Sequence, residues 1–277
     1  MPGADPTGPL PASWARDELV LDEREHWAVA DWSGGDDAVC VLFDPIGGSR
    51  PVTDQHGRPV AGDPESVTPG RMLLAVGRSD RVGTLAAAAL DREIAARRPL
   101  ASAWIATEAL PPLLDRLAAL GLRPRRTGWE WMVIRDRPAA VPAEHRLRPL
   151  TPADRDATRA CLAVANPATE AIPVADGERW WGVGAPGGPL LGVIGAEQRP
   201  GAIDGAGSWH LHGLGVRPEA RGQGLGGALT AGAARALLAE GADWVSLGMW
   251  DDNAGARRIY HRLGFRTVHR LVTLHRD

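Results

Sequence analysis

Short runs in the second half of the chain place hydrophobic side chains at alternating positions. These runs have the length of strands and are rich in β-branched or aromatic residues. They predict strands at 145–150, 178–183, 188–197, 208–216, 243–250 and 265–274. Strands that alternate with helical segments indicate the α/β class.

Three longer segments have helical patterns instead. The segment 151–165 begins with a threonine, a proline and acidic residues, which is typical of a helix start. Between 224 and 241, one helical face collects Leu225, Leu229, Ala233 and Leu237. A capped helix is predicted at 253–264.

The chain also repeats itself weakly at an offset of 143 residues. Without a gap, 78–98 lies over 221–241, and the order of loop, helix, strand, helix and glycine is the same in both halves. This order predicts a duplication, with one domain at 14–137 and a second at 145–277, joined by the proline-rich stretch 135–149. Two unrelated α/β domains of similar composition are the alternative.

Composition narrows the class of protein. The chain has 277 residues and a net charge of −3, so its overall charge does not favour nucleic acid as a partner. No apolar run approaches the roughly 20 residues that span a bilayer. The first residues lack the basic start and apolar core of a signal peptide, and Cys40 and Cys161 suit buried positions. These features predict a cytoplasmic protein, and its lysine-free, arginine-rich composition indicates a GC-rich, bacterial genome.

The stretch "VRPEARGQGLGGAL" (216–229) contains the main candidate chemistry. Gly222, Gly224 and Gly227 satisfy the G-x-G-x-x-G pattern of dinucleotide-binding loops. Only 50 residues follow Gly227, however, which is too few for the strand–helix units that complete such a domain. A phosphate-binding P-loop is excluded because no Gly-Lys-Ser/Thr follows. A glycine-rich turn without a ligand is a further alternative.

Two motifs together resemble the GNAT superfamily of acetyl-CoA-dependent N-acyltransferases. Arg221-x-x-Gly224-x-Gly226 after a strand resembles one signature of the family. The second motif resembles N-x-x-A-x-x-x-Y-x-x-x-G-F and consists of Asn253, Ala256, Tyr260, Gly264 and Phe265. The resemblance covers the region from about residue 146 to the C-terminus and implies a mixed, mostly antiparallel sheet flanked by helices. Through the repeat, it implies two such domains.

The resemblance implies a role for each motif residue. Coenzyme A has a pyrophosphate, which suits the amides and positive dipole of a helix N-terminus next to an arginine. The expected acetyl-CoA contacts are Leu214, Gly215, Val216, Arg221, Gly222, Gln223, Gly224, Leu225, Gly226, Asn253 and Ala256. Tyr260, the chain's one tyrosine, is the expected acid for the departing thiolate; a packing aromatic is the alternative.

The base and the acceptor are less closely determined. His210 stands where several relatives carry a glutamate, and an imidazole near its usual pKa suits a base; a structural histidine is the alternative. His210 and His212 are expected on one face of their strand. Residues 166–208 have acidic side chains in excess, which weakly favours a cationic amine, although a solvated acidic surface explains them equally. Trp180 and Trp181 are expected on opposite faces of their strand.

At the offset of 143, the first half lacks the motif residues of the second half. Asn253 and Tyr260 are matched by Leu110 and Leu117, and the glycine loop is matched by a stretch that contains Asp80. This pattern predicts a degenerate first domain, a tandem plan that resembles mycothiol synthases and other bacterial double-GNAT proteins.

The leading hypothesis is an N-acetyltransferase that moves an acetyl group directly to a primary amine of a small molecule or peptide, with one active site in the second half. An NAD-dependent oxidoreductase and a non-catalytic CoA-binding sensor are the alternatives. No metal, nucleic-acid or membrane partner is predicted.

Overall fold

The fold was obtained as a computed structural model, which describes residues 10–24, 27–45, 71–124, 128–169, 171–185, 187–199, 201, 203 and 207–276. Its α-helices are α1 (Glu18–Glu23), α2 (Ser79–Ala95), α3 (Leu114–Ala119), α4 (Arg155–Ala165), α5 (Leu225–Ala239) and α6 (Ala254–Leu263). Strands of the first half are β1 (Trp27–Gly35), β2 (Ala38–Pro45), β3 (Arg71–Gly77), β4 (Leu100–Ala106), β5 (Leu122–Pro124) and β6 (Trp129–Ile134). Strands of the second half are β7 (Leu147–Leu150), β8 (Arg179–Val183), β9 (Gly192–Arg199), β10 (Ser208–Val216), β11 (Trp244–Trp250) and β12 (Arg266–Arg276).

The described strands form one mixed sheet in the order β1-β2-β3-β4-β12-β6-β11-β10-β9-β8-β7, with β5 paired to β12. Two neighbouring pairs are parallel, β3 with β4 and β10 with β11, and the other pairs are antiparallel. The predicted mixed, mostly antiparallel sheet is therefore confirmed. A doubly wound dinucleotide-binding domain needs a mostly parallel sheet, so this topology does not support the NAD alternative.

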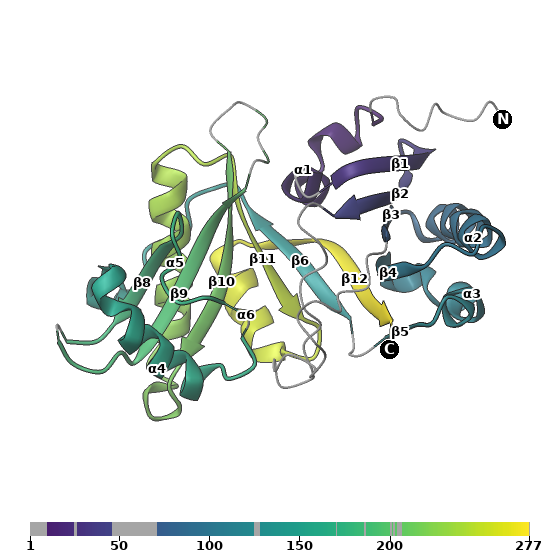
Figure 1. The fold of residues 1–277 in the computed structure, drawn as a ribbon. Coiled ribbons are helices and arrows are strands. Elements are labelled where there is room, and N and C mark those ends of the chain that lie inside the picture. The colour runs from purple at the N-terminus through teal and green to yellow at the C-terminus, as the bar shows by residue number, and fades with distance from the viewer. Residues whose placement is uncertain are drawn as a thin grey trace.

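Strands of the two halves interleave at the centre of the sheet (Figure 1). β6 lies between β11 and β12, and β12 lies between β4 and β6. We expected a separate sheet in each half, but each half completes the sheet of the other. The division at 137–145 stays a prediction about the sequence, since no boundary in the sheet coincides with it.

The sheet separates four hydrophobic clusters. Helices α5 and α6 pack on one face with residues such as Leu211 and Leu247, while α4 packs on the opposite face with Val193. In the first half, α2 and α3 cover one face and α1 covers the other. Successive side chains of β6 point to opposite faces of the sheet, so this strand relates the faces of the two halves. Met132 belongs to the cluster under α5, and Trp131 belongs to the cluster under α1. Helices α1 and α4 therefore share a face of the sheet.

Most predicted elements appear in the structure within a few residues of their expected bounds. The α5 stripe is confirmed, because Leu225, Leu229, Ala233 and Leu237 are all buried. The offset of 143 places the predicted helix 253–264 over 110–121, but the helix observed there is shorter: a 3₁₀ turn covers Pro111–Leu113, and only Leu114–Ala119 is α-helical. The two prolines at 111 and 112 lack backbone N–H groups and disfavour an α-helical start for the residues before them.

Both cysteines are free and buried, as expected. Burial raises the pKa of the Cys40 thiol to about 12. Within the described residues, no helix is long and apolar enough to cross a membrane.

Candidate active site

The glycine loop joins the end of β10 to the start of α5, as the motif predicts. Gly222 and Gly224 have φ of +78° and +75°, and an added Cβ would meet no protein atom within 4 Å at either position. Glycine is therefore required there by the left-handed backbone and not by close packing. The first helical bond of α5 runs from the amide of Ala228 to the carbonyl of Gly224, 3.0 Å long. The amides of 225–227 precede it and have no acceptor within the helix.

Arg221 fixes the same loop to its surroundings. Its Nε donates to the carbonyl of Val216 at 3.2 Å, and an Nη donates to the carbonyl of Ala165 at 3.4 Å. The side chain of Gln223 accepts from Arg146 at 3.3 Å. Arg221 thus has a structural role beyond the expected electrostatic one, because it connects the end of β10 to the end of α4.

A β-bulge interrupts the pairing of β10 with β9 next to this loop. The parallel pair runs from Ser208 to Leu211 on β10, and the register with β9 shifts between His212 and Gly215. Gly213 has φ of +60°, and a Cβ there would lie 2.9 Å from the ring of Trp180. Past Leu211, the edge of β10 that faces β11 no longer has a strand partner on that side. Its amides therefore have no strand partner on that side, while the carbonyls of Leu214 and Val216 accept from the side chains of Asn166 and Arg221.

Two packing features hold this bulged segment in place. Gly215 allows close contact with α4, since a Cβ there would lie 3.0 Å from Cβ of Ala165. Asn166, at the end of α4, donates from Nδ2 to the carbonyl of Leu214 at 3.1 Å. The predicted contacts Leu214, Gly215 and Val216 therefore lie in a segment whose backbone is firmly positioned.

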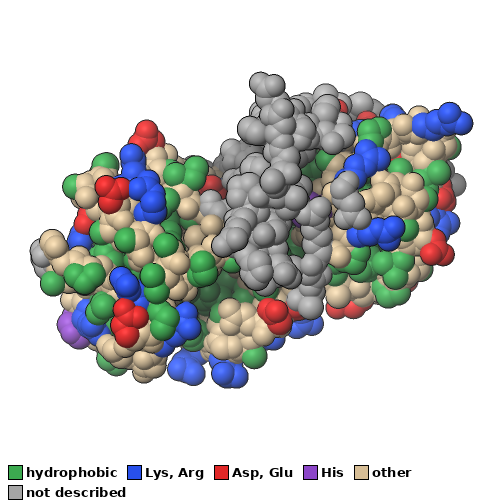
Figure 2. All heavy atoms as spheres, turned by 60° about the horizontal axis from the view of Figure 1, so that its bottom comes forward, with side chains coloured by type: hydrophobic (Ala, Val, Ile, Leu, Met, Phe, Trp, Pro, Cys, Tyr) green, Lys and Arg blue, Asp and Glu red, His purple; other side chains and the backbone are tan. Residues whose placement is uncertain are grey.

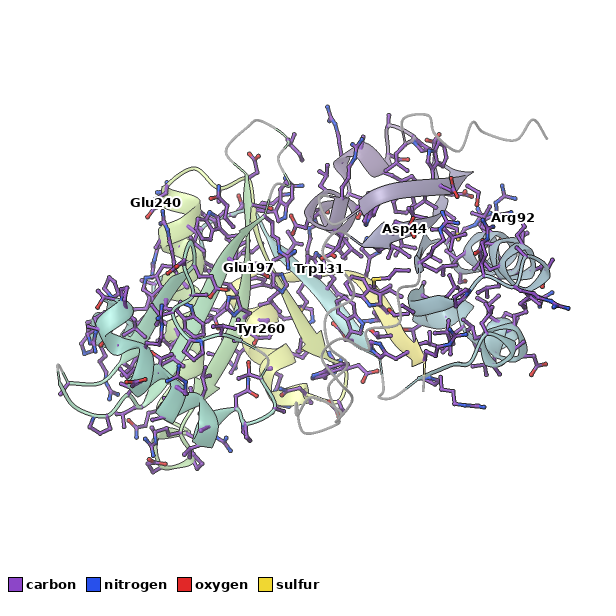
Figure 3. All side chains as sticks on the ribbon, in the orientation of Figure 1. Asp44, Arg92, Trp131, Glu197, Glu240 and Tyr260 are labelled. Atoms are coloured by element: carbon purple, nitrogen blue, oxygen red, sulfur yellow. The ribbon has the colours of Figure 1, made fainter. Side chains whose placement is uncertain are left out.

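Helix α6 positions the candidate acid. Asn253 caps this helix, with Oδ1 accepting from the amide of Ala256 at 3.0 Å, so its first role in the structure is local. Tyr260 is 8% exposed and lies 5.9 Å, centroid to centroid, from the ring of Phe265. Burial raises the pKa of Tyr260 to about 12, so the hydroxyl stays protonated at neutral pH. Figure 3 labels Tyr260 in the region of α6.

The candidate base lies in a polar and aromatic setting. The ring of His210 stacks on Trp131, with centroids 4.7 Å apart and planes inclined by 18°. Its Nδ1 is 3.0 Å from Oγ of Ser246 on β11. Glu197 is its cross-strand neighbour on β9. Figure 3 labels Trp131 on β6 and Glu197 on β9.

The candidate acid and base occupy opposite faces of the sheet. Trp209 and Leu211 belong to the hydrophobic cluster that contains Tyr260, and His210 alternates with them along β10. His210 and His212 share the other face, as expected. The pairing of β10 with β11 ends at Leu211, one residue beyond His210, so both groups can act on one reacting centre only past this point.

The environment of His212 differs from that of His210. Nε2 of His212 lies 3.4 Å from the carboxylate of Glu178, and its ring meets Trp180 edge-on. Glu178 also accepts from the indole of Trp180 at 2.8 Å. Trp180 is buried and Trp181 packs in the cluster on the other face, as expected. Trp180, which lies on the same face as His212, is therefore part of the core.

The acidic residues between α4 and β10 are less available than the sequence suggested. Glu178 is bonded as above, and Glu197 pairs with Arg199 at 2.6 Å. Asp176 lies 3.9 Å from Arg155. Glu170 and Asp204 lie outside the described residues. Since most of these described carboxylates have cationic or hydrogen-bonding partners, the case for a cationic acceptor is weaker. Over the face in Figure 2, acidic and basic side chains are interspersed.

Sequence reasoning missed several residues that shape this site. Local sequence patterns do not predict the roles of Gly213, Asn166 and Ser246, because a bulge and a partner on another strand have no local signal in the sequence. Asp22 and Glu130 come from the first half of the chain and contact the second half. Within the described residues, no group of three or more histidine, cysteine, aspartate or glutamate side chains could hold a metal ion.

The comparisons with known proteins agree with this geometry. Residues 152–265 match the model of the acetyltransferase (GNAT) family. This part of the chain is similar to the GNAT family. The matched region includes α4, the bulged β10, the glycine loop, α5, β11 and α6, and therefore every residue predicted for the site.

Among curated proteins, parts of the chain are similar to mycothiol acetyltransferases. The chain is 38% identical to the mycothiol acetyltransferase of Kocuria rhizophila over 80 residues, which cover 29% of this chain and 26% of that protein. It is 37% identical to that of Beutenbergia cavernae over 106 residues, 36% of this chain and 34% of that protein. The chain thus matches only a quarter to a third of the length of these relatives.

Among solved structures, the likeness extends over both halves. The GCN5-related N-acetyltransferase of Kribbella flavida covers 97% of each chain, with 18% identity and a TM-score of 0.51. A GNAT-family acetyltransferase of Novosphingobium aromaticivorans covers 94% of this chain and 96% of that one, with 19% identity and a TM-score of 0.51. At such identities the likeness establishes the fold and nothing finer.

Proposed function

We propose that this protein is an acetyl-CoA-dependent N-acetyltransferase that moves an acetyl group directly to a primary amine, at one active site in the second half. The observation that carries the proposal is the join of β10 and α5. A glycine loop, three helix amides without helical acceptors and a bulged strand edge lie next to one another there. These groups suit a pyrophosphate followed by an extended, amide-containing arm.

The residues fit acetyl-CoA by the chemistry of their donors. The amides of 225–227 and the left-handed loop at Gly222 and Gly224 are suited to hold the pyrophosphate, and the positive end of the α5 dipole favours its charge. The edge of β10 at Leu214 and Val216 suits the pantetheine arm. Bound acetyl-CoA would supply the activated acyl group and the thiolate that leaves.

Three tasks then fall to the chain itself. A backbone amide of the bulge stabilises negative charge on the thioester oxygen. His210 accepts the proton that the amine nitrogen loses as it bonds to the acyl carbon. Tyr260 gives its hydroxyl proton to the leaving sulfur, and the proton on His210 returns through solvent to Tyr260. One amide bond forms and one thioester bond breaks.

An acceptor screen tests the proposal directly. The full chain is incubated with acetyl-CoA and a panel of amines, and free CoA thiol is detected. Amine-dependent thiol release is the expected result. Acetyl-CoA binding without release by any amine would favour the sensor alternative, and binding of NAD in place of acetyl-CoA would favour the oxidoreductase.

The variant Tyr260→Phe tests the assignment of the acid. It removes one hydroxyl and keeps the ring that packs against Phe265. We expect unchanged acetyl-CoA affinity by calorimetry and a turnover lower by about 10²–10⁴-fold, the usual contribution of a positioned acid. Wild-type turnover at saturating substrate would remove Tyr260 from this role.

A further inference from the structure

A buried carboxylate from the first half of the chain reaches the second half beside the candidate base. Asp22, on α1, has no exposed surface and accepts hydrogen bonds from two hydroxyls and one indole of the second half. Ser246 donates at 2.9 Å, the Trp244 Nε1 donates at 3.2 Å, and Ser208 donates to the other oxygen. Three donors converge on this side chain, which is the environment of an ionised carboxylate.

Ser246 connects this carboxylate to His210. Its Oγ lies 2.9 Å from Oδ2 of Asp22 and 3.0 Å from Nδ1 of His210. A hydroxyl has one hydrogen, and the charged oxygen of Asp22 is nearer than the other acceptor, the carbonyl of Trp209 at 3.4 Å. Ser246 therefore donates to Asp22 and can only accept from His210.

This direction determines the tautomer of His210. Nδ1 must carry the ring hydrogen to donate to Ser246, so the lone pair of the neutral ring is on Nε2. The stack on Trp131 holds the ring plane. If the ring gains a proton at Nε2, its charge is stabilised through Ser246 by the Asp22 carboxylate. Of the nearby charged groups, Arg199 pairs with Glu197 at 2.6 Å and lies 3.9 Å from Glu23.

We propose that Asp22, acting through Ser246, is a positioning residue that holds His210 with Nε2 ready to accept a proton. The first half of the chain thereby contributes a residue to the active site of the second half. The inference deepens the proposed function and rests on it for the role of His210 as a base. The hydrogen-bond chain itself can be tested without any substrate.

Nitrogen NMR of the histidine rings in the full chain is that test, with His210→Gln used to assign the signals. In the wild type we expect the neutral ring of His210 to carry its hydrogen on Nδ1. In Ser246→Ala we expect a lower His210 pKa and loss of this tautomer preference, because Nδ1 loses its acceptor. A wild-type ring with hydrogen on Nε2, or an unchanged pKa and tautomer in Ser246→Ala, would overturn the proposal.

Kinetics give a second readout. Partners that fix the tautomer of metal-bound histidines contribute on the order of 10–100-fold to activity, and we expect a comparable effect here: Ser246→Ala should lower kcat by that factor and leave KM for acetyl-CoA unchanged. In Ser246→Ala, the limb of the kcat–pH profile that reports the ionisation of His210 should shift in the same direction as the pKa of His210 measured by NMR. An unmoved limb would overturn the link between Asp22 and the base.

Ser102→Ala is the matched control. Ser102 is also a buried strand serine, and its hydroxyl has no hydrogen-bond partner among the described residues. It should keep the wild-type tautomer, pKa and pH profile. If no amine supports thiol release in any variant, the proposed function fails, and the NMR result still decides whether the hydrogen-bond chain exists.

Discussion

At the scale of single residues, the buried carboxyl of Asp22 lowers the stability of the folded protein when it ionises, although the same side chain is proposed to position His210. Burial raises the pKa of its carboxyl to about 6, although bonds from Ser208, Trp244 and Ser246 act in the opposite direction. A raised folded-state pKa means that the folded protein holds this proton more tightly than the unfolded chain. The resulting stability is complete below about pH 4 and is lost as the pH rises through 6.

The variant Asp22→Asn should reveal this cost. It cannot ionise, so its free energy of unfolding should rise relative to that of the wild type by about 3 kcal/mol between pH 3 and pH 8. Urea unfolding of both proteins across this range measures the difference. Curves that stay parallel would show that the pKa of Asp22 is the same in the folded and unfolded chain.

Residues differ in how far the sequence predicts their role. Tyr260 and the glycines of the loop stand at fixed spacings next to a clear strand and helix, so their places are predicted locally. Asp22 lies 224 positions from Ser246, and nothing near "LVLDE" indicates that this acid is buried beneath another half of the chain. A contact of that kind depends on tertiary structure alone.

At the scale of elements, α6 is held by a residue of the first half. Glu130 on β6 is 2% exposed on its side chain and accepts from Arg257 of α6 at 2.7 and 3.0 Å. Thr267 donates to its other oxygen at 2.6 Å. Burial alone would raise the pKa of Glu130, but these bonds and the nearby arginines hold it below its usual value. The helix that carries Tyr260 is thus anchored to β6.

The variant Glu130→Gln keeps the shape of this anchor and removes its charge. We expect a loss of about 2 kcal/mol in unfolding free energy at pH 7, as for hydrogen bonds to charged groups. Because the pKa is lowered, the carboxylate's contribution is present above about pH 4.5 and disappears as the pH falls through the folded-state value. The difference in unfolding free energy between variant and wild type should therefore disappear at acid pH. Urea unfolding at several pH values measures this difference.

Asp91→Asn is the control for that variant. Asp91 pairs with Arg116 at 2.8 Å, but its side chain is 56% exposed. Exposed pairs contribute little, and we expect a change below about 1 kcal/mol. An equal loss in both variants would show that burial gives Glu130 no special weight in anchoring α6.

Elements with strong periodicity were predictable, and their pairing was not. The stripe of α5 and the run of β10 follow from side-chain spacing. The position of β6 between β11 and β12 does not, because the sequence of a strand sets its buried faces and not its neighbours. The prediction of separate sheets failed for this reason.

At the scale of the whole molecule, the interleaved strands support a duplication. At the offset of 143, β4 corresponds to 243–249 in β11, and β6 corresponds to 272–277 at the end of the chain. β4 pairs with β12 and β11 pairs with β6, both antiparallel. We propose that two related copies exchanged their last strands reciprocally. Each copy then needs the other to complete its sheet.

The corresponding loop of the first half differs in geometry as well as in residues. Only Arg78 separates β3 from α2, whereas eight residues, 217–224, separate β10 from α5. Asp80 lies in the first turn of α2 and not in a loop, where it pairs with Arg78 at 2.8 Å. Leu117, the counterpart of Tyr260, is fully buried in the core.

One acetyl-CoA should therefore bind per chain, at the loop that precedes α5. Calorimetric titration of the full chain is expected to give a stoichiometry near one, and Gly224→Asp should abolish binding. Aspartate at position 224 would have to adopt a φ of +75° and would place a negative charge where the pyrophosphate is held. Gly177→Asp, in an exposed turn with φ of +81°, has the same backbone cost away from this loop and should bind normally. A stoichiometry near two, falling to one in Gly224→Asp, would show that the first copy also binds the cofactor.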